Sequence, residues 1–384
     1  MDIIKKRIGI IGGGQLGKMM ILEAKRLGFY VITIDPTEDC PSHSISDEHI
    51  VAEFYDEKAI LKLAEKSDVI TYESEHINVE VLEELTRKGH VIYPSVASLK
   101  IIQNKYSQNQ ALQKGGIPIP RFALVDSIET IKSLGNKENF GYPLMLKTTM
   151  GGYDGKGNAL IQTEADIEEA YHSLGSGSRE LMVEEFVDFE KEISIIATRG
   201  IDGSKVVYPP AENSHSNSIL DTTIVPARFS PTAVEKAKEI ATKVMDVFEG
   251  VGTFCAEMFI HKNGDISVNE VAPRPHNSGH YTIEGCFANQ FENHIRAIVG
   301  LPFGNTDLRT PTVMVNLLGE SNGPAKLLGL EEAYNDPNVH VHLYGKSESK
   351  TGRKMGHYTV VGKTIEDTIK RAEALKKVVR VIGE

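Results

Sequence analysis

Cysteine is scarce in this sequence. Cys40, Cys255 and Cys286 are the three present, and no two of them form a CxxC pair. Such a set provides neither a disulfide framework nor the usual ligand spacing of a zinc site. The N-terminus leads directly into a strand pattern, without the features of a signal peptide. These features favour a reducing, cytoplasmic location.

An excess of positive charge and long hydrophobic runs are also absent. The formal net charge is −11, which argues against general nucleic-acid binding. No apolar run reaches membrane-spanning length, and we find neither an internal repeat nor a low-complexity segment. With 384 residues, 40% hydrophobic and 25% charged, the chain is predicted to be a globular protein of two or three domains. Anionic substrates would therefore require local clusters of basic residues.

The first hundred residues alternate between strand and helix patterns. A strand over 7–11 is followed by the loop Gly12-Gly13-Gly14-Gln15-Leu16-Gly17, a helix pattern and a second strand ending at Asp35. Further strands are predicted over 68–72 and 90–94, with helices between them, which indicates a parallel sheet. A GxGxxG loop with an acid about twenty residues later fits the dinucleotide fingerprint. An NAD-dependent oxidoreductase is therefore one alternative.

The most informative stretch runs from Cys255 to His280. Two apolar runs over 254–260 and 266–272 flank an Asn-Gly-Asp turn, which predicts a β-hairpin. Each run carries one carboxylate, Glu257 or Glu270, and paired strands would place the two side by side. Two buried carboxylates repel one another unless a cation or a proton separates them. Two carboxylates with substrate phosphates are a common Mg²⁺ site, whereas a salt-bridged Glu beside an edge Glu is the simpler alternative.

The residues after this hairpin carry a family resemblance. Asn269-Glu270 leads into the loop Val271-Ala272-Pro273-Arg274-Pro275-His276-Asn277-Ser278-Gly279-His280, which two prolines stiffen. This run resembles the ATP-grasp ligases, and among them the N5-carboxyaminoimidazole ribonucleotide synthetases. The motifs GGGQLG, GGYDGKG, EEFV and GRKMGH follow the order of that family over nearly the whole chain. One difference is Ala272, since many ATP-grasp enzymes have Asn at this position.

A glycine-rich loop predicts a phosphate site. Lys147 ends an apolar run, and four glycines follow within residues 151–157. Such a loop can direct backbone N–H groups at phosphates, although it lacks the GK[ST] ending of a Walker A loop. A glycine-rich hairpin without function is the alternative.

The resemblance implies an ATP site. Backbone groups of 184–187 would bind the adenine edge, Glu192 the ribose and Lys105 the phosphates, with Lys105 at a position where the family usually has Arg. The complete implied set is Lys105, Lys147, Gly152, Tyr153, Asp154, Gly155, Lys156, Gly157, Asn158, Glu184, Glu185, Phe186, Val187, Glu192, His215, Asn269 and Glu270. Glu257 and Glu270 would be the metal ligands. Arg274, His276, Asn277, Tyr153 and Asp154 would form the catalytic group. Of these, Arg274 with His276 and Asn277 would hold bicarbonate or carboxyphosphate, and Tyr153 and Asp154 would lie near the second substrate.

The second substrate is expected at two other motifs. Gln15 and Leu16 of the glycine loop, and Glu73 at a strand end, would contact an aminoimidazole ribonucleotide. Four cations lie within 346–354 of an otherwise acidic chain. A solvated charge run is the usual explanation of such a tract. The match to GRKMGH instead implies that Lys346, Arg353 and Lys354 bind the ribonucleotide phosphate, with Gly352 permitting the turn.

These features predict an α/β, three-domain ATP-grasp fold. A Rossmann-like domain would cover residues 1–100, an ATP-grasp domain 101–300 with a lid subdomain at about 118–190, and a β-rich domain 301–384. The resemblance implies a Mg²⁺-dependent carbon–nitrogen ligase of purine biosynthesis, and a homodimer. It would use ATP and bicarbonate to carboxylate 5-aminoimidazole ribonucleotide. A formate-dependent glycinamide ribonucleotide transformylase, the NAD-dependent enzyme above and a nucleotide-sensing regulator are the alternatives.

Overall fold

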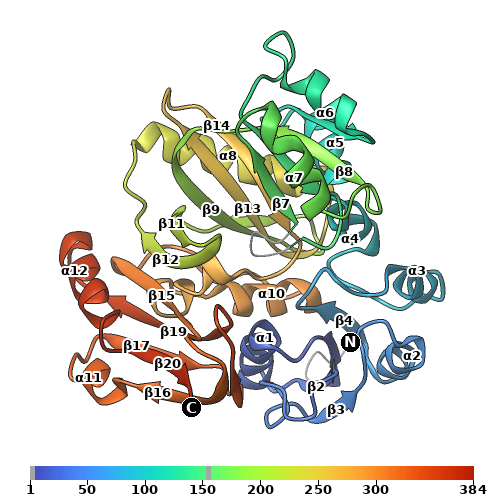
Figure 1. The fold of residues 1–384 in the computed structure, drawn as a ribbon. Helices are drawn as coiled ribbons and strands as arrows, with labels where there is room; N and C mark the ends of the chain where they lie inside the picture. The colour runs from blue at the N-terminus through green and yellow to red at the C-terminus, as the bar shows by residue number, and fades with distance from the viewer. Residues whose placement is uncertain (1–4, 153–156) are drawn as a thin grey trace.

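Four short N-terminal strands form a parallel sheet in the order β3–β2–β1–β4. The computed structural model describes residues 5–152 and 157–384 (Figure 1). Buried branched residues dominate the strands, and amphipathic helices cover the sheet. The elements are β1 Arg7–Ile11, α1 Gln15–Arg26, β2 Tyr30–Asp35, β3 Glu48–Val51, α2 Glu57–Lys66, β4 Val69–Tyr72 and α3 Val79–Arg87. The predicted parallel sheet is confirmed, and β3 is an additional strand.

Two expectations for the end of this domain were wrong. The predicted strand over 90–94 is reduced to a single bridge between Ile70 and Ile92, because the chain turns into a helix immediately afterwards. Residues 98–114 have the sequence pattern of a single connecting helix but form two helices, α4 Val96–Gln103 and α5 Lys105–Lys114. Asn104 separates them in extended conformation and caps α5 by accepting a hydrogen bond from the Ser107 N–H. This break directs Lys105 toward the centre of the molecule.

A small antiparallel sheet forms the subdomain at the top of Figure 1. Its strand order is β5–β8–β6–β7, and two helices cover one face through a core that includes Ile131, Leu146 and Ile167. The elements are β5 Phe122–Val125, α6 Ile128–Gly135, β6 Leu144–Thr148, β7 Asn158–Ile161, η2 Glu164–Asp166, α7 Ile167–Ser173 and β8 Leu181–Glu185. The glycine-rich stretch lies between β6 and β7 in the chain, and its described residues Gly152 and Gly157 lie next to these strands.

A nine-stranded sheet occupies the middle of the molecule. Its main path is β14–β13–β9–β11–β12–β15–β19–β17, and β10 pairs with β9. The elements are β9 Phe189–Arg199, β10 Lys205–Val207, β11 Ala211–Ser216, β12 Ile219–Val225, α8 Pro231–Phe248, β13 Gly252–His261, β14 Ile266–Ala272, η3 Asn277–Gly279, α9 Thr282–Gly285, α10 Gln290–Val299, β15 Thr312–Leu318, β17 Val339–Leu343 and β19 Lys354–Val361. The sheet therefore continues without interruption past residue 300.

Helix α8 shows how the sequence builds this core. Ser230 caps the helix by accepting from the Ala233 N–H, and Pro231 takes the first helical position, where no N–H is needed. Ala237, Ile240 and Val244 recur at helical spacing and pack on the face of β9 and β13. Since β13 carries the predicted metal ligand Glu257 and pairs with β14, the buried helix face fixes the position of the hairpin.

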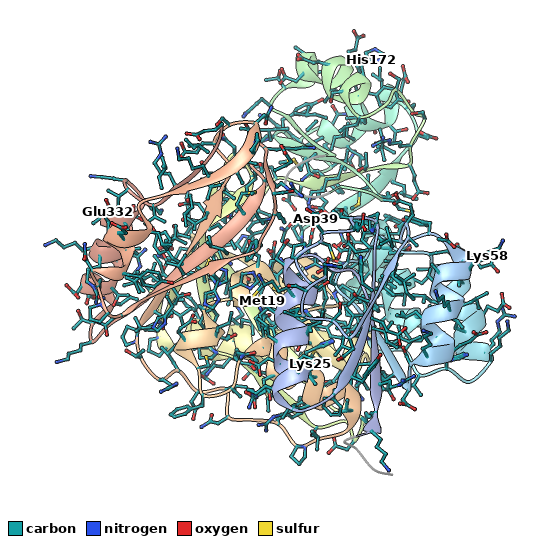
Figure 2. All side chains as sticks on the ribbon, turned by 90° about the horizontal axis from the view of Figure 1, so that it is seen from below. Met19, Lys25, Asp39, Lys58, His172 and Glu332 are labelled. Atoms are coloured by element: carbon teal, nitrogen blue, oxygen red, sulfur yellow. The ribbon has the colours of Figure 1, made fainter. Side chains whose placement is uncertain are left out.

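The C-terminal segment completes the fold with a separate three-stranded sheet in the order β18–β16–β20. Its elements are β16 Gly323–Leu328, α11 Leu330–Tyr334, β18 Glu348–Ser349, α12 Ile365–Leu375 and β20 Arg380–Gly383. Polar side chains such as Lys58, His172 and Glu332 lie on the periphery of the three regions (Figure 2). Among the residues that the structure describes, no helix combines the length and apolar character needed to cross a membrane.

Helix α10 joins the N-terminal sheet to the central one. Phe291, Ile295 and Ile298 pack in the same cluster as Met20 and Ala24 of α1. On its other side, the His294 ring accepts a hydrogen bond from the Thr253 N–H of β13 at 3.1 Å. The other ring nitrogen lies 2.8 Å from Thr71 Oγ1 of β4. The strand ends of both sheets therefore face one shared region.

Candidate active site

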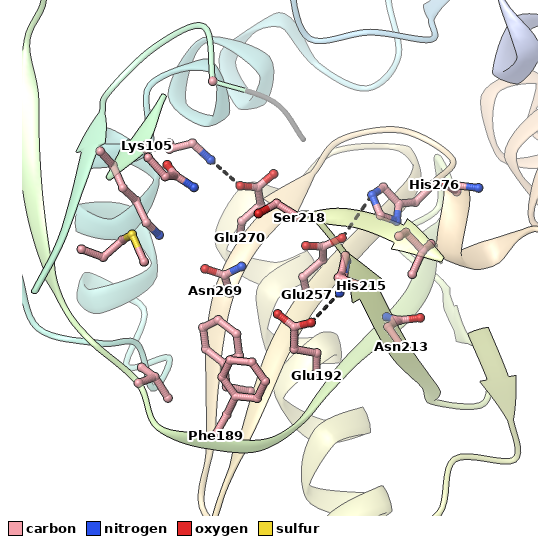
Figure 3. A pocket seen from close by; sticks show the side chains of 18 of the residues that line it. Lys105, Phe189, Glu192, Asn213, His215, Ser218, Glu257, Asn269, Glu270 and His276 are labelled. Atoms are coloured by element: carbon pink, nitrogen blue, oxygen red, sulfur yellow. Dashed lines mark hydrogen bonds and ion pairs between the residues drawn. The ribbon is translucent and has the colours of Figure 1, made fainter. Parts of the chain in front are cut away.

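A cleft of about 970 Å³ lies where the three regions meet. The N-terminal domain contributes the glycine loop and the end of β4 to its walls. The small antiparallel sheet contributes β6, β7 and β8, called the lid strands below. The central sheet contributes β9, β11, β13, β14 and the loop after β14. Figure 3 shows carboxylates, amides and amines from these elements pointing into one space. A cleft of this size with a few convergent charged groups is typical of a small-molecule site.

The two hairpin carboxylates face each other across β13 and β14. Glu257 is the register partner of Glu270, as predicted, and a β-bulge follows directly at Glu257/Met258. Burial and the charge of Glu270 raise the pKa of Glu257 to about 7. Burial opposes the ionisation of Glu270 also, but the neighbouring Lys105 outweighs it and lowers the pKa of Glu270. The pair is thus a strongly negative site, and a divalent cation would relieve its repulsion.

Two lysines lie on the lid side of this pair. Lys105 forms an ion pair with Glu270 (Figure 3), and Lys147 forms an ion pair with the buried Glu184. Asn109 donates a second hydrogen bond to Glu184 at 2.9 Å. The contact between Glu184 of β8 and Lys147 of β6 fixes the Lys147 ammonium group, and Glu270 of β14 fixes that of Lys105. Both ammonium groups lie beside the space that Gly152 and Asn158 also line.

On the other side of the pair lies the loop after β14. His276 Nε2 is 3.2 Å from Glu257 Oε1. Burial, followed by the charge of Arg274, lowers the pKa of His276 to about 3, so its ring is neutral. Arg274 donates to Glu75 through Nε at 2.5 Å and through Nη2 at 3.1 Å. Asn277 and Asn316 of β15 form a reciprocal amide pair at 3.0 and 2.8 Å, which holds the loop against the central sheet.

The third side of the cleft is formed by β9 and β11. Glu192 forms an ion pair with His215 (Figure 3). Burial opposes a charge on His215, but Glu192 outweighs it and raises the pKa of His215. Phe189 and Phe259 stack with ring centroids 4.8 Å apart and form an apolar wall next to this pair and to residues 184–187. The arrangement combines an apolar surface with polar groups, which suits a nucleoside.

The glycine loop is occupied by the chain's own acids. Glu73 accepts the Gly14 N–H at 2.7 Å and the Gly17 N–H at 2.5 Å, and Asp35 accepts the Gly13 N–H at 2.9 Å. A Cβ on Gly12 would lie 2.1 Å from Glu73 Cγ. The glycines therefore admit an internal carboxylate at the helix N-terminus, where a dinucleotide would place its pyrophosphate. This arrangement argues against the NAD-dependent alternative, and a ribonucleotide could use the remaining lone pairs of the anchored Glu73.

The basic tract lies close to the same loop. Lys346 Nζ donates to the Lys354 carbonyl at 2.8 Å, and Arg353 Nη1 donates to the Glu348 carbonyl at 2.6 Å. Burial and the nearby Arg353 lower the pKa of Lys346 to about 8, while Glu73 acts in the opposite direction. Gly352 makes the turn with a φ of +78°. Lys354 lines the cleft itself, whereas Lys346 and Arg353 lie beyond its lining.

Most of the predicted site residues meet in this cleft. The lining includes Gln15, Leu16, Glu73, Lys105, Lys147, Gly152, Asn158, Glu184, Glu185, Phe186, Val187, Glu192, His215, Glu257, Asn269, Glu270, Arg274, His276, Asn277 and Lys354. Gly157 is not in the lining but makes the loop turn with a φ of +88°. Tyr153, Asp154, Gly155 and Lys156 lie outside the described residues.

Sequence reasoning missed four residues of this region. Glu75 could have been found, because it is an acid at the same strand end as Glu73. Asn316, Phe189 and Phe259 carry no local signal, because only the strand register brings them to the cleft. Their contribution depends on tertiary structure.

Comparisons with known proteins agree along the chain. Residues 5–103 match the ribonucleotide synthetase preATP-grasp domain, 110–291 the ATP-grasp domain, and 312–371 the phosphoribosylaminoimidazole carboxylase C-terminal domain. An N5-carboxyaminoimidazole ribonucleotide synthase of Bacillus subtilis (strain 168) is 44% identical over 357 residues, 92% of this chain and 90% of that protein. The crystal structure of the synthetase from Thermotoga maritima has a TM-score of 0.90 at 46% identity and covers 99% and 100% of the two chains. An Aspergillus clavatus synthase, in complex with ADP and 5-aminoimidazole ribonucleotide, has a TM-score of 0.90 at 35% identity over 98% of each chain.

Proposed function

The chain belongs to the N5-carboxyaminoimidazole ribonucleotide synthase family of ATP-grasp ligases, and on that premise we propose how its cleft catalyses the family's reaction. The reaction is the ATP-dependent carboxylation of 5-aminoimidazole ribonucleotide by bicarbonate. One observation carries the assignment of roles. The Glu257–Glu270 pair has lysines on its lid side and Arg274 and His276 on its other side, all within one cleft.

ATP occupies the lid half of the cleft. The apolar wall of Phe189 and Phe259 and the backbone of residues 184–187 receive the adenine, and Glu192 with His215 receives the ribose. Lys105 and Lys147 then lie at the phosphates, where their charges offset the negative charge of the γ-phosphoryl group. Gly152, Gly157 and Asn158, which are the described residues at the ends of the glycine-rich loop, flank the phosphates.

The carboxylate pair suits a magnesium ion. Glu257 and Glu270 offer oxygen ligands only. The raised pKa of Glu257 reflects its burial and the repulsion from Glu270, and a divalent cation would relieve that repulsion. Asn269 adjoins the pair as a further oxygen donor in the lining. When bound, Mg²⁺ neutralises charge on the phosphate oxygens and orients them. Lys105 would then move from Glu270 toward the phosphates.

Bicarbonate occupies the space between Arg274 and His276. Its oxygen attacks the γ-phosphorus, ADP leaves, and the product is carboxyphosphate. The amino group of the ribonucleotide then attacks the carboxyl carbon, and inorganic phosphate leaves. Arg274 balances the negative charge of the acyl phosphate, and the neutral His276 ring can hold a proton at Nε2 beside Glu257. Asn277, fixed by Asn316, adds a polar contact at the same loop.

The ribonucleotide spans the N-terminal and C-terminal regions. Gln15, Leu16 and Glu73 flank the aminoimidazole and ribose, while Lys354, Lys346 and Arg353 bind the phosphate. Support comes from Lys18 of α1, which follows the glycine loop and donates to the carbonyls of Leu343 at 3.0 Å and Tyr344 at 3.3 Å, next to the basic tract. This position puts the amine near Arg274 and away from the adenine wall.

An ADP-release assay tests the proposal. With ATP and Mg²⁺ present, sustained release should require both bicarbonate and 5-aminoimidazole ribonucleotide. Formate with glycinamide ribonucleotide should not replace them. Equal release with formate would assign the chain to the transformylase reaction, and ATP binding without release would support a regulator. We further propose a cytoplasmic homodimer, which rests on the family resemblance and can be tested by analytical ultracentrifugation.

A further inference from the structure

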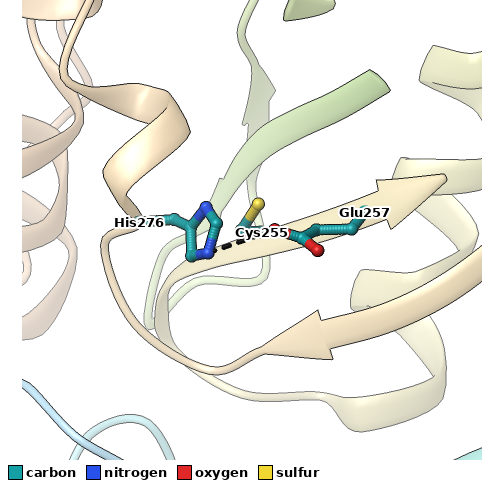
Figure 4. Close-up of side chains that lie close together, drawn as sticks. All are labelled: Cys255, Glu257 and His276. Atoms are coloured by element: carbon teal, nitrogen blue, oxygen red, sulfur yellow. Dashed lines mark ion pairs between the residues drawn. The ribbon is translucent and has the colours of Figure 1, made fainter. Parts of the chain in front are cut away.

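Three side chains with the donor atoms of a zinc site meet at the base of the cleft. Cys255 Sγ, one carboxylate oxygen of Glu257 and one ring nitrogen of His276 all lie within 4.8 Å of one another (Figure 4). Cys255 and Glu257 are two residues apart on β13 and so share a face of the sheet. The loop after β14 brings His276 over that face. The sequence does not indicate this set, because His276 is distant from Cys255 in the chain and no CxxC pair is present.

We propose that Cys255, Glu257 and His276 form an inhibitory site for a thiophilic divalent cation of the Zn²⁺ type. Thiolate, imidazole and carboxylate are the ligands that zinc takes, and three protein ligands with one open position is a common arrangement. Mg²⁺ takes oxygen ligands and gains nothing from the thiol. The site therefore distinguishes the two metals, although they share Glu257.

The distance between His276 and Glu257 fits this coordination, and Cys255 Sγ lies within 4.8 Å of both ligand atoms. Bonds of about 2.0–2.3 Å in a tetrahedron place neighbouring ligand atoms on the order of 3.5 Å apart. His276 Nε2 and Glu257 Oε1 are 3.2 Å apart, and a cation inserted between them would replace their present contact. Glu257 and His276 line the cleft, so the ion can enter from solvent. Cys255 is fully buried and lies on the side of the site away from the cleft.

Ser278 provides the supporting contacts that such a site requires. Its hydroxyl lies 2.9 Å from His276 Nδ1 and 3.8 Å from Cys255 Sγ. Ser194 donates to the same hydroxyl at 2.7 Å. His276 Nδ1 accepts from the Ser278 N–H at 3.3 Å, so a metal at Nε2 would require the ring proton to move to Nδ1, where the Ser278 hydroxyl at 2.9 Å can accept it.

Occupation would stop the proposed reaction at two points. The ion would take Glu257 from the magnesium position and His276 from the bicarbonate position. Cys255 has no part in the proposed chemistry. Its thiol acts only as a ligand of the inhibitory ion. The expected effect on turnover rests on the proposed function, whereas binding of the metal ion can be measured independently of it.

The experiment uses Co²⁺ as a spectroscopic substitute for Zn²⁺ in the full-length protein, in chelator-free buffer. The wild type should show a thiolate-to-cobalt charge-transfer absorption that Zn²⁺ abolishes. C255S should lose it, while C40S and C286S, which alter the other two buried cysteines, should keep it. Absence of the band in the wild type, or its persistence in C255S, would overturn the site. Failure of the ligase assay would leave this readout intact.

Inhibition is then measured by ADP release at fixed Mg²⁺. The Zn²⁺ concentration for half inhibition should rise at least about tenfold in C255S and stay unchanged in C40S and C286S. Equal sensitivity of C255S and the wild type would contradict the proposal. C255A provides a second test if the serine hydroxyl destabilises the buried position, and circular dichroism establishes that each variant is folded.

Discussion

Glu75 and Arg274 are 199 residues apart in the chain and form a two-point ion pair between the N-terminal domain and the loop after β14. Both side chains are largely buried, at 20% and 17% exposure. Burial acts against ionisation of Glu75, but Arg274 outweighs it and lowers the pKa of Glu75 to about 2. Glu75 lies in the loop after β4, which also carries Glu73 and would contact the ribonucleotide. This loop therefore also orients the Arg274 guanidinium, which would contact bicarbonate.

Replacing Glu75 by Gln should impair use of bicarbonate. Loss of a charged hydrogen-bonding partner costs about 1.5–3 kcal/mol, so we expect kcat/KM for bicarbonate to fall about ten- to a hundredfold. KM for ATP should change little. Glu80→Gln, an exposed acid on α3, is the matched control. Wild-type kinetics in the Glu75 variant would show that Arg274 needs no such support.

Replacing Glu270 by Gln should reduce kcat by orders of magnitude in a folded protein. The substitution removes one of two proposed magnesium ligands and also the ion-pair partner of Lys105. ADP release is measured across a Mg²⁺ titration. Asp265→Asn, at the exposed tip of the same hairpin, is the control. Near-normal turnover at saturating Mg²⁺ would remove the two-carboxylate site from the mechanism.

Replacing Arg353 by Ala should raise KM for the ribonucleotide about ten- to a hundredfold, because a guanidinium can hold two phosphate oxygens at once. KM for ATP should be almost unchanged, since this phosphate would be remote from the nucleotide. Lys350→Ala, an exposed cation of the same turn, is the control. If ATP binding suffers instead, the tract belongs to the nucleotide site.

His294 should make stability depend on acid pH. Burial lowers its folded-state pKa to about 3, while the unfolded value is about 6.5. Between these values the unfolded chain binds a proton that the native state excludes. Stability is therefore retained above about pH 6.5 and falls by about 1.4 kcal/mol for each pH unit below it, from this group alone.

The measurement compares urea unfolding of wild type and His294→Gln at pH about 5 and about 7. The variant should be less stable near neutrality, because contacts to Thr71 and Thr253 are lost, but its stability should fall less on acidification. His340→Gln, on an exposed side chain of β17, should keep the wild-type slope. An unchanged slope in the His294 variant would contradict the assignment.

Replacing Gly12 by Ala should destabilise the N-terminal domain more than Gly28→Ala does. Both glycines have positive φ, +113° and +84°, so the conformational strain is comparable. A Cβ at Gly12 would displace Glu73, whereas Gly28 has nothing within 4 Å. Two buried N–H groups would lose their acceptor, which costs about 1–3 kcal/mol each. Equal shifts in Tm for the two variants would show that Glu73 does not anchor the loop.

The sequence was sufficient for elements whose signal is local. The parallel N-terminal sheet and the hairpin of β13 and β14 followed from strand patterns and turn residues, and the strand register does place Glu257 opposite Glu270. The motifs, taken in their order along the chain, were enough to indicate the family. These predictions succeeded because short-range propensity and tertiary structure favour the same result.

Other features depend on contacts that no local pattern contains. Asn104 fits the pattern of one continuous helix, yet the return of the chain toward Thr149 makes it a cap between two helices. The glycine loop fits a dinucleotide fingerprint, and only the fold shows that Glu73 and Asp35 occupy its N–H groups. Glu75 could be seen as an acid at a strand end, but its partner Arg274 could not be derived from spacing.

The continuity of the central sheet limits how this protein can be divided. Strand β12 is hydrogen-bonded to β15, from Thr222–Val315 to Val225–Thr312. A protein truncated after α10 would expose β12 as an unpaired edge with free N–H and C=O groups, a surface that templates aggregation. The C-terminal region is therefore not a detachable module. Evolution or engineering could change the proposed substrate-binding turn of this region by point substitution more readily than by exchange of the whole segment.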